Sequence, residues 1–278
     1  MEEDTREPAR SGDDTLFYSS YMQIQDPLVA SVRSEAFGED IGQFSWTTAD
    51  EMRRFFRMLE LGPESKVLDV ASGSGGPSLF MARSTGCHVT GVDITYSGIQ
   101  TANEVAASLG LTSQALFERV DASGPMPFDD GAFDAIICID AIDHFMDRVS
   151  LFKEWYRVLR PGGRILFTDP IVVTGLLERE EIITRSTSMG IFVFTPAGLN
   201  ERFIEAAGFP SPHVEDVTDN IVLVSSKWRQ ARANHAGELA ELEGRTTYEN
   251  FQRFLATVHR LASEKRLSRM LYVASKPA

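Results

Sequence analysis

The chain has 278 residues and a formal net charge of −13, and 43% of its residues are hydrophobic. This length and composition predict one large α/β domain, or one domain with a cap, around a substantial core. Because phosphate contacts need clustered Lys and Arg, the acidic balance argues against nucleic acid or an anionic membrane as the partner. No apolar run approaches the ~18 residues of a membrane span, and the acidic start is no secretory signal. Two cysteines, Cys87 and Cys138, fall inside predicted strands as buried thiols, which predicts a soluble, cytoplasmic protein.

An N-terminal arm precedes the predicted core. Residues 1–14 are charged, lack an apolar period and predict disorder. The segment from Pro27 to Phe37 then carries a helical period. Further on, Thr48 and Glu51 form a capping box that opens a second helix, with phenylalanines and leucines on its apolar face.

The most informative segment of the sequence is 67–78. Its first residues predict a buried strand at 66–71, Gly73 and Gly75 follow, and a helix is expected over 76–84. Glycine has no Cβ, so the backbone can turn sharply and lie against a ligand. A strand, glycine turn and helix of this kind open a nucleotide-binding βαβ unit, although many such turns are glycine-rich for packing alone.

Acidic residues end the next two predicted strands. Asp93 closes the strand 88–93, 24 residues after Asp69, where a carboxylate can accept both hydroxyl protons of a ribose. Asp121 closes the strand 115–120 and can accept from an adenine amino group, while the following amide donates to the ring. A dinucleotide oxidoreductase is the competing interpretation. This interpretation is disfavoured because Ser78 occupies the third glycine position of the G-x-G-x-x-G motif of such enzymes. A dinucleotide oxidoreductase also has no need for the second acidic residue, Asp121.

Strands at 133–139 and 163–168 and helices at 97–109 and 148–159 complete the alternation that a parallel sheet requires. Asp140 and His144 follow the fourth of these strands. Being four residues apart, they share a face if the turn is helical. The carboxylate suits a cationic amine, and the histidine can take a proton from it near neutral pH. Alternatively, His144 only caps or packs this turn.

The segment 171–268 interrupts the expected last strands and predicts a helical cap. Helices are expected at 176–184, 195–208 and 228–242, the sixth strand begins within Val214 to Val224, and a capping box at 246–249 opens one more helix. A strand over 268–276 closes the sheet. The basic residues near 265–269 are expected to face solvent, and the histidines show no metal-ligand spacing. Candidate lining residues of the cap are Arg185, Phe192, Phe194, Trp228 and His235.

Five segments in this order resemble the class I S-adenosylmethionine-dependent methyltransferases: VLDVASGSGG (67–76), GVDIT (91–95), RVDA (119–122), FDAIICIDAIDHF (133–145) and LRPGGRILFTDP (159–170). Three segments are similar to the phosphoethanolamine and sarcosine/dimethylglycine N-methyltransferases: FGED (37–40), GVDITYSGIQTANE (91–104) and IDAIDH (139–144).

The resemblance implies a doubly wound, Rossmann-like, seven-stranded α/β sheet with an antiparallel last strand, an N-terminal lid and a helical cap insertion. It divides a single domain into an arm or lid (1–45), a donor-binding core (46–170), the cap with the sixth strand (171–268) and the last strand (269–278). It implies S-adenosylmethionine as cofactor and S-adenosylhomocysteine as product. The cofactor-binding residues implied are Gln43, Ser45, Trp46, Asp69, Ala71, Gly73, Gly75, Asp93, Ile94, Asp121, Ala122 and Ile139. The catalytic residues implied are His144, Asp140 and Tyr21.

Two positions depart from the phosphoethanolamine enzymes. Counting back from FGED reaches Gln25 where those enzymes have a lid tyrosine, so Tyr18 or Tyr21 must substitute after a small shift. Pro170 replaces a tyrosine that helps to hold phosphate there. These departures disfavour phosphobase recognition, and TDP at 168–170 is more similar to the sarcosine/dimethylglycine enzymes. We therefore expect N-methylation of a small-molecule amine, by a monomer or homo-oligomer. The alternatives are O- or C-methylation of a secondary metabolite, or donor binding without turnover.

Overall fold

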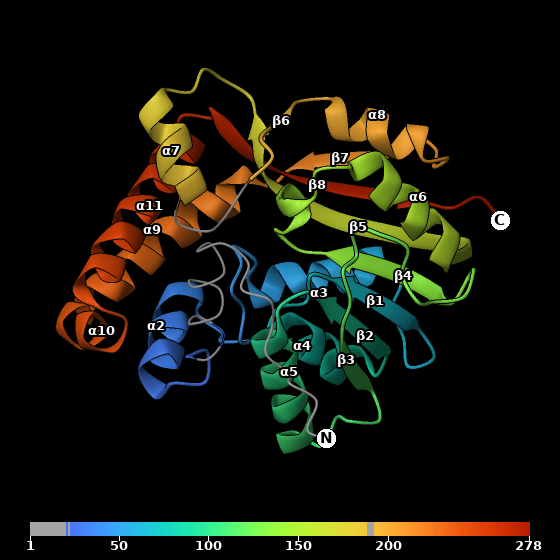
Figure 1. The fold of residues 1–278 in the computed structure, drawn as a ribbon, viewed down its shortest axis with the longest axis horizontal. Coiled ribbons are helices and arrows are strands. Elements are labelled where there is room, and N and C mark those ends of the chain that lie inside the picture. The colour runs from blue at the N-terminus through green and yellow to red at the C-terminus, as the bar shows by residue number, and fades with distance from the viewer. Residues whose placement is uncertain (1–20, 22, 188–191) are drawn as a thin grey trace, which may run out of the picture.

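A mixed β-sheet forms the centre of the computed structural model, which describes residues 21, 23–187 and 192–278 (Figure 1). Its strand order is β3-β2-β1-β4-β5-β8-β7, and a short strand, β6, pairs with β5 off this path. The strands are β1 (Lys66–Val70), β2 (His88–Asp93), β3 (Ala115–Arg119), β4 (Phe133–Cys138), β5 (Leu159–Val173), β6 (Thr195–Pro196), β7 (His213–Asp216) and β8 (Leu267–Ser275). Strand β8 runs antiparallel to both of its neighbours, whereas β1 to β5 pair in parallel. The predicted doubly wound sheet with a reversed last strand is confirmed.

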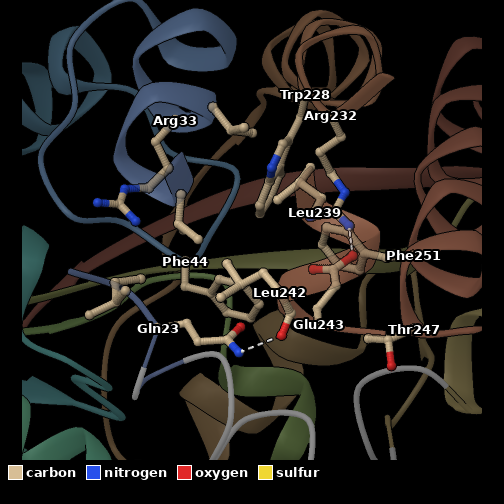
Figure 2. Close-up of a pocket in the computed structure, with 13 residues that line it drawn as sticks. Gln23, Arg33, Phe44, Trp228, Arg232, Leu239, Leu242, Glu243, Thr247 and Phe251 are labelled. Atoms are coloured by element: carbon tan, nitrogen blue, oxygen red, sulfur yellow. Dashed lines mark hydrogen bonds and ion pairs between the residues drawn. The ribbon is translucent and has the colours of Figure 1, made fainter. Parts of the chain in front are cut away.

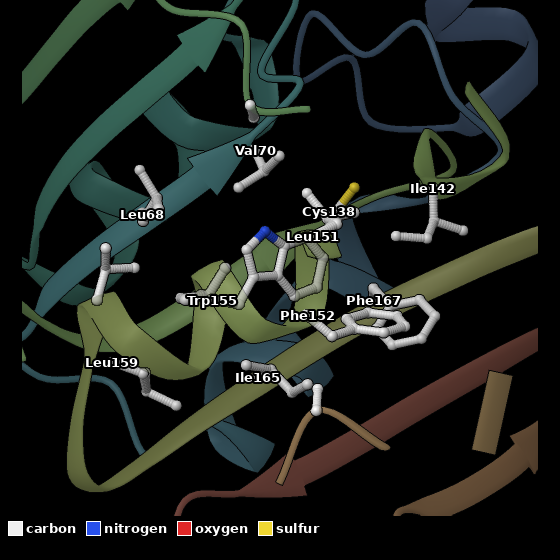
Figure 3. Packing of buried hydrophobic residues seen from close by; sticks show 14 of the residues in the cluster. Leu68, Val70, Cys138, Ile142, Leu151, Phe152, Trp155, Leu159, Ile165 and Phe167 are labelled. Carbon is white, nitrogen blue, oxygen red and sulfur yellow. The ribbon is translucent and has the colours of Figure 1, made fainter. Parts of the chain in front are cut away.

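Helices cover both faces of the sheet, so the side chains of its central strands are mostly apolar on both faces. Successive residues of β1 point to opposite faces: Val67 packs under α3 (Ala49–Met58) and α4 (Gly76–Thr85), and Leu68 packs toward α6 (Arg148–Val158). The α6 face is filled by aromatic side chains around Trp155, which is fully buried (Figure 3). Helix α5 (Tyr96–Ser108) packs on β3, and α8 (Leu199–Ala206) joins α6. This packing fixes the carboxyl ends of the parallel strands in space.

A separate group of helices lies beside the sheet, on the left of Figure 1. It comprises α2 (Pro27–Phe37), α7 (Arg179–Thr187), α9 (Thr218–Asn234), α10 (Ala236–Leu242) and α11 (Arg245–Ser263). Their shared core is aromatic, with Trp228 edge-on to Phe37 at 5.3 Å and to Phe251 at 5.3 Å between ring centroids. Helix α2 thus packs with helices that follow it by almost 200 residues. Within the described ranges, no helix is long and apolar enough to cross a membrane.

The sixth strand is shorter than the sequence predicts. Strand β7 ends at Asp216, and the rest of the expected segment to Val224 belongs to α9. The Asp216 carboxylate accepts a hydrogen bond from the Thr218 amide at 2.9 Å and so helps the helix to begin. Ile221, Val224 and Trp228 then recur at helical spacing on the buried face. The prediction failed because a run of apolar, β-branched residues is compatible with either a strand or a helix.

Other predicted boundaries also shift. The helix expected over 228–242 is two helices, divided at His235. The segment 195–208 begins as β6, so its helix starts only after Gly198, which has a left-handed φ of 83°. Helix α11 begins at Arg245 without a side-chain cap, so the predicted capping box at 246–249 is wrong. In contrast, the Thr48 hydroxyl accepts from the Glu51 amide at 3.2 Å, as the first capping box predicts.

Candidate functional site

The turn between β1 and α4 forms the floor of a pocket at the carboxyl ends of the strands. Ala71, Gly73 and Gly75 all have left-handed φ angles, of 60°, 54° and 77°. A Cβ on Gly73 would lie 2.9 Å from the Tyr21 hydroxyl, so only glycine permits this close approach. The predicted residues that line the pocket are Tyr21, Ser45, Asp69, Ala71, Gly73 and Ile139. Residues that were not predicted but also line it are Gly42, Phe44, Ser72, Ser74 and Pro77.

The Tyr21 side chain lies against the glycine turn. Its ring packs against Gly73 and Gly98 and is 9% exposed. Burial, together with the nearby charge of Asp93, raises the pKa of the Tyr21 phenol well above its ordinary value. The phenol therefore stays protonated at neutral pH and acts as a hydrogen-bond group, not as a base.

Two buried carboxylates lie beside the glycine turn. Asp93 accepts hydrogen bonds from the Gly73 amide at 2.9 Å and from the Thr95 amide at 2.8 Å. Burial raises the pKa of Asp93, against the lowering effects of these hydrogen bonds and of the His144 charge. Asp69 accepts a hydrogen bond from the Ser78 hydroxyl, and burial raises the pKa of Asp69 to about 7. Since each carboxylate oxygen carries two lone pairs, Asp93 keeps acceptor capacity for a ligand hydroxyl beyond these bonds.

A second group of predicted residues lies at the ends of β2 and β3. Ile94 is 46% exposed although it is large and apolar, and so offers a flat surface to a ring. Asp121 is exposed and accepts from the amide and the hydroxyl of Ser123, at 3.0 and 2.5 Å. Ala122, by contrast, is buried in the core next to α6. These residues lie outside the pocket lining described above.

The loop before α3 contributes unequally to the pocket. Ser45 lines it, whereas Gln43 is fully buried and its side-chain oxygen accepts from the Ile41 amide at 2.9 Å. Trp46 packs in the aromatic core of the helical group, 5.8 Å from Trp228 and 6.1 Å from Phe254 between ring centroids. Of the three predicted loop residues, only Ser45 therefore faces the pocket, and the other two hold the loop in place.

Asp140 is held by a buried arginine. Its carboxylate binds Arg269 at 2.7 Å and 3.2 Å and accepts from the Trp46 amide at 2.9 Å. The same guanidinium binds Glu51 at 2.7 Å, and the Arg269 side chain is fully buried. The prediction that Arg269 faces solvent was therefore wrong. Two carboxylates from distant segments compensate the charge of its buried guanidinium. Because its oxygens are engaged, Asp140 does not present the open carboxylate that the sequence predicted for an acceptor amine.

His144 ends a short 3₁₀ turn, Ile142–His144, which does not include Asp140. The two side chains therefore do not share a helical face. The imidazole is exposed and lies 4.9 Å from the Phe192 ring. Its charge acts on Asp93, which places it within electrostatic reach of the glycine-turn pocket. His144 is thus in a position to meet a molecule bound between the sheet and the helical group.

The remaining candidate residues of the cap differ in their surroundings. Arg185 is buried, stacks on Phe192 and Phe254 at 5.5 and 5.0 Å, and has no ion pair within the described part of the chain. Burial lowers the pKa of Arg185 to about 10. His235 instead lies on the outside, paired with Glu35. Among residues 21, 23–187 and 192–278, no group of His, Cys, Asp and Glu could hold a metal ion.

Comparison with known proteins decides the family. A family model described as a methyltransferase domain matches residues 68–167. A sarcosine/dimethylglycine N-methyltransferase from Halorhodospira halochloris is 30% identical over 194 residues, which cover 66% of this chain and 67% of that enzyme. The chain belongs to the S-adenosylmethionine-dependent methyltransferases.

Relatives of this methyltransferase differ in their acceptors. Phosphoethanolamine N-methyltransferase 1 from Zea mays is 32% identical over 217 residues, but this chain spans only 42% of its length. The 27-O-demethylrifamycin SV methyltransferase from Amycolatopsis mediterranei (strain S699) is 26% identical over 259 residues, which cover 89% of this chain and 94% of that enzyme. The family is therefore clear, whereas the acceptor is not fixed by similarity.

Solved structures support the same fold. A phosphoethanolamine N-methyltransferase 2 from Haemonchus contortus, solved with S-adenosylhomocysteine, superimposes with a TM-score of 0.78 at 20% identity, covering 94% of this chain and 61% of that one. The 4+2 cyclase SpnF superimposes with a TM-score of 0.74 at 22% identity, covering 98% of both chains. One fold thus carries methyl transfer and cyclisation, so the reaction must be argued from the site.

The methyltransferase pocket fits the family's cofactor. At Gly73 the backbone approaches a neighbouring side chain more closely than a Cβ would allow, and Ala71, Gly73 and Ser74 of the same turn line the pocket. Asp69 and Asp93 supply carboxylate oxygens beside the glycine turn as hydrogen-bond acceptors. Ile94 presents an exposed apolar surface at the end of β2. The carboxylate acceptors and the exposed apolar surface are the chemistry that S-adenosylmethionine needs.

Proposed function

We propose that this methyltransferase transfers the methyl group of S-adenosylmethionine to a small-molecule acceptor bound between the sheet and the helical group. The observation that carries the proposal is the pocket at the strand ends, where the glycine turn, Asp69 and Asp93 meet, with His144 beside it. In doubly wound sheets, ligands bind at this edge. The two buried, free cysteines also support the expected cytoplasmic location.

The chain's own residues bind and orient the donor. Asp93 accepts from the ribose hydroxyls, Ile94 packs on the adenine, and Asp121 with the Ala122 amide recognises the ring edge. Asp69 balances the donor's positive charge, and Tyr21 closes over the glycine turn and excludes water. When bound, S-adenosylmethionine supplies an already activated methyl group. Positioning is therefore the protein's main contribution, of up to about 7–11 kcal/mol in favourable cases.

His144 is the residue we assign to the acceptor's proton. Its imidazole is exposed beside Phe192, and an imidazole is the side chain best suited to exchange a proton near neutral pH. Asp140 acts as a positioning residue, because its carboxylate ties the Trp46 amide to Arg269. The nucleophile is an amine, as the sarcosine and phosphoethanolamine relatives favour, or a hydroxyl, as the rifamycin relative favours.

Replacing His144 with alanine is expected to lower the methyl-transfer rate about 10²-fold, the lower part of the range for general-base catalysis, because positioning remains. Donor affinity should stay within a factor of two or so of the unchanged chain, since His144 contributes no donor contact in this proposal. Single-turnover rates and calorimetric S-adenosylhomocysteine binding check the two quantities. If the alanine variant transferred the methyl group at the normal rate, His144 would have only a packing role.

Donor affinity is expected to rise with pH up to about pH 7 and then to level off. Burial raises the pKa of Asp69 to about 7, so below that value the carboxyl is protonated and loses its attraction for the cationic donor. The raised pKa of Asp93 acts in the same direction. The measurement is calorimetric S-adenosylmethionine affinity between pH 5.5 and 8.5. Asp69→Asn should reduce this dependence, and an affinity that falls with pH would contradict the assignment.

The decisive experiment on the function uses a deuterated-methyl donor with a mixed panel of amines, phenols and enolisable acids, read by mass spectrometry. A labelled amine supports N-methylation, and a labelled phenol or carbon acid supports the O- or C-methyl alternative. If the chain binds S-adenosylhomocysteine but labels nothing from a broad panel, the binding protein without turnover becomes the better description.

A further inference from the structure

A second cavity lies inside the helical group, between α2 and helices α9 to α11 (Figure 2). Its volume is about 360 Å³, within the ~300–1,000 Å³ range of pockets for drug-sized ligands. Most of its lining is aromatic or aliphatic: Ile24, Val29, Val32, Phe44, Trp228, Leu239, Leu242 and Phe251. A cavity of this size and character suits an apolar ring system and exceeds the needs of a small amine.

Phe44 separates this cavity from the donor pocket, because it lines both. On the donor side its ring meets Tyr21 edge-on at 6.2 Å, and on the other side it packs on Phe251 at 6.5 Å and Trp228 at 6.0 Å between ring centroids. The two spaces therefore share one aromatic wall. A molecule in the cavity lies one side chain away from the glycine-turn pocket.

The cavity carries no uncompensated charge among its described lining residues. Arg232 is paired with Glu243, and its guanidinium stacks 4.5 Å above the Phe251 ring. Arg33 is paired with Asp40 at 2.7 Å, and Figure 2 shows its guanidinium pointing away from the other labelled residues. A phosphate or carboxylate would find both cations already neutralised. A small ammonium ion would find no open carboxylate, since Glu243 is engaged.

We infer that this cavity holds the body of the methyl acceptor, and that the acceptor is a bulky, uncharged, largely apolar molecule whose nucleophilic amine or hydroxyl extends past Phe44 toward the donor. The assignment rests on the proposed function. The cavity's size and charge define the class of acceptor. Sarcosine and phosphoethanolamine, which are small and charged, match an apolar, charge-balanced cavity poorly.

The binding test uses N-phenyl-1-naphthylamine, a neutral apolar fluorophore, with the full chain saturated with S-adenosylhomocysteine. We expect one site per chain, not displaced by millimolar sarcosine or phosphoethanolamine. Val29→Trp and Thr247→Trp enlarge half-buried lining residues and should weaken probe binding about tenfold or more. Leu223→Trp, on an exposed surface of α9, is the matched control and should leave it unchanged.

Equal probe binding by all three variants, or no probe binding by a chain that binds S-adenosylhomocysteine normally, would overturn the cavity assignment. A chain that does not bind S-adenosylhomocysteine would instead refute the proposed function itself. Turnover gives the second readout: polycyclic phenols and anilines should accept the deuterated methyl group, with kcat/KM reduced about tenfold or more in Val29→Trp. Labelled sarcosine with an unchanged kcat/KM in that variant would also overturn the assignment.

Discussion

Asp93→Ala is expected to weaken S-adenosylhomocysteine binding about 10²–10⁴-fold. In the proposed complex the carboxylate accepts from two ribose hydroxyls, and hydrogen bonds to a charged group contribute ~1.5–3 kcal/mol each. The carboxylate also fixes the Gly73 amide at 2.9 Å, so its removal loosens the turn that binds the rest of the donor. Calorimetric titration with S-adenosylhomocysteine measures the loss directly.

Two companion variants separate this effect from a general loss of structure. Asp93→Asn keeps one carbonyl oxygen for the Gly73 amide and should lose less affinity than the alanine variant. Asp129→Ala removes an exposed carboxylate outside the pocket lining and should bind normally. Unchanged affinity in a folded Asp93→Ala chain would show that the donor site has been placed wrongly.

The glycine turn and the position of Asp93 at a strand end could be predicted because their signals are local. The turn at Gly73 follows directly from the strand and the helix that flank it, and Asp93 is the last residue of its strand. In a parallel sheet, the ends of neighbouring strands meet at one edge, so residues far apart in sequence are brought together by a rule that needs no side-chain detail.

The predictions failed where a residue's environment depends on distant partners. Arg269 lies in a short basic cluster, and only its contacts with Asp140 and Glu51 make it a core residue. Phe44 was missed as a lining residue because its neighbours Tyr21, Trp228 and Phe251 come from three separate segments. The start of α9 was mistaken for a strand because isoleucine and valine fit either structure until the packing of the whole molecule selects one.

Arg269→Met is expected to lower the free energy of unfolding by about 3–5 kcal/mol, the usual effect of removing one partner from a buried ion pair. The substitution leaves Asp140 and Glu51, whose side chains are 2% and 9% exposed, without their cation. It also frees the loop that Asp140 anchors through the Trp46 amide. Urea denaturation measures the change, and S-adenosylhomocysteine affinity should fall with it because Ser45 of the same loop lines the donor pocket.

Arg53→Met is the matched control, because Arg53 also binds two carboxylates, Glu39 and Asp50, but with 41% of its side chain exposed. Solvent screens such pairs, so a much smaller loss of stability than in Arg269→Met is expected. A double-mutant cycle of Asp140→Asn with Arg269→Met then tests the role of Asp140, with a coupling energy of about 0.5–3 kcal/mol expected for residues in contact. If Asp140 faced the acceptor instead, Asp140→Asn would lower kcat/KM without loss of stability, and the coupling with Arg269 would vanish. Measuring stability and turnover on the same four chains therefore distinguishes a carboxylate that builds the site from one that binds the substrate.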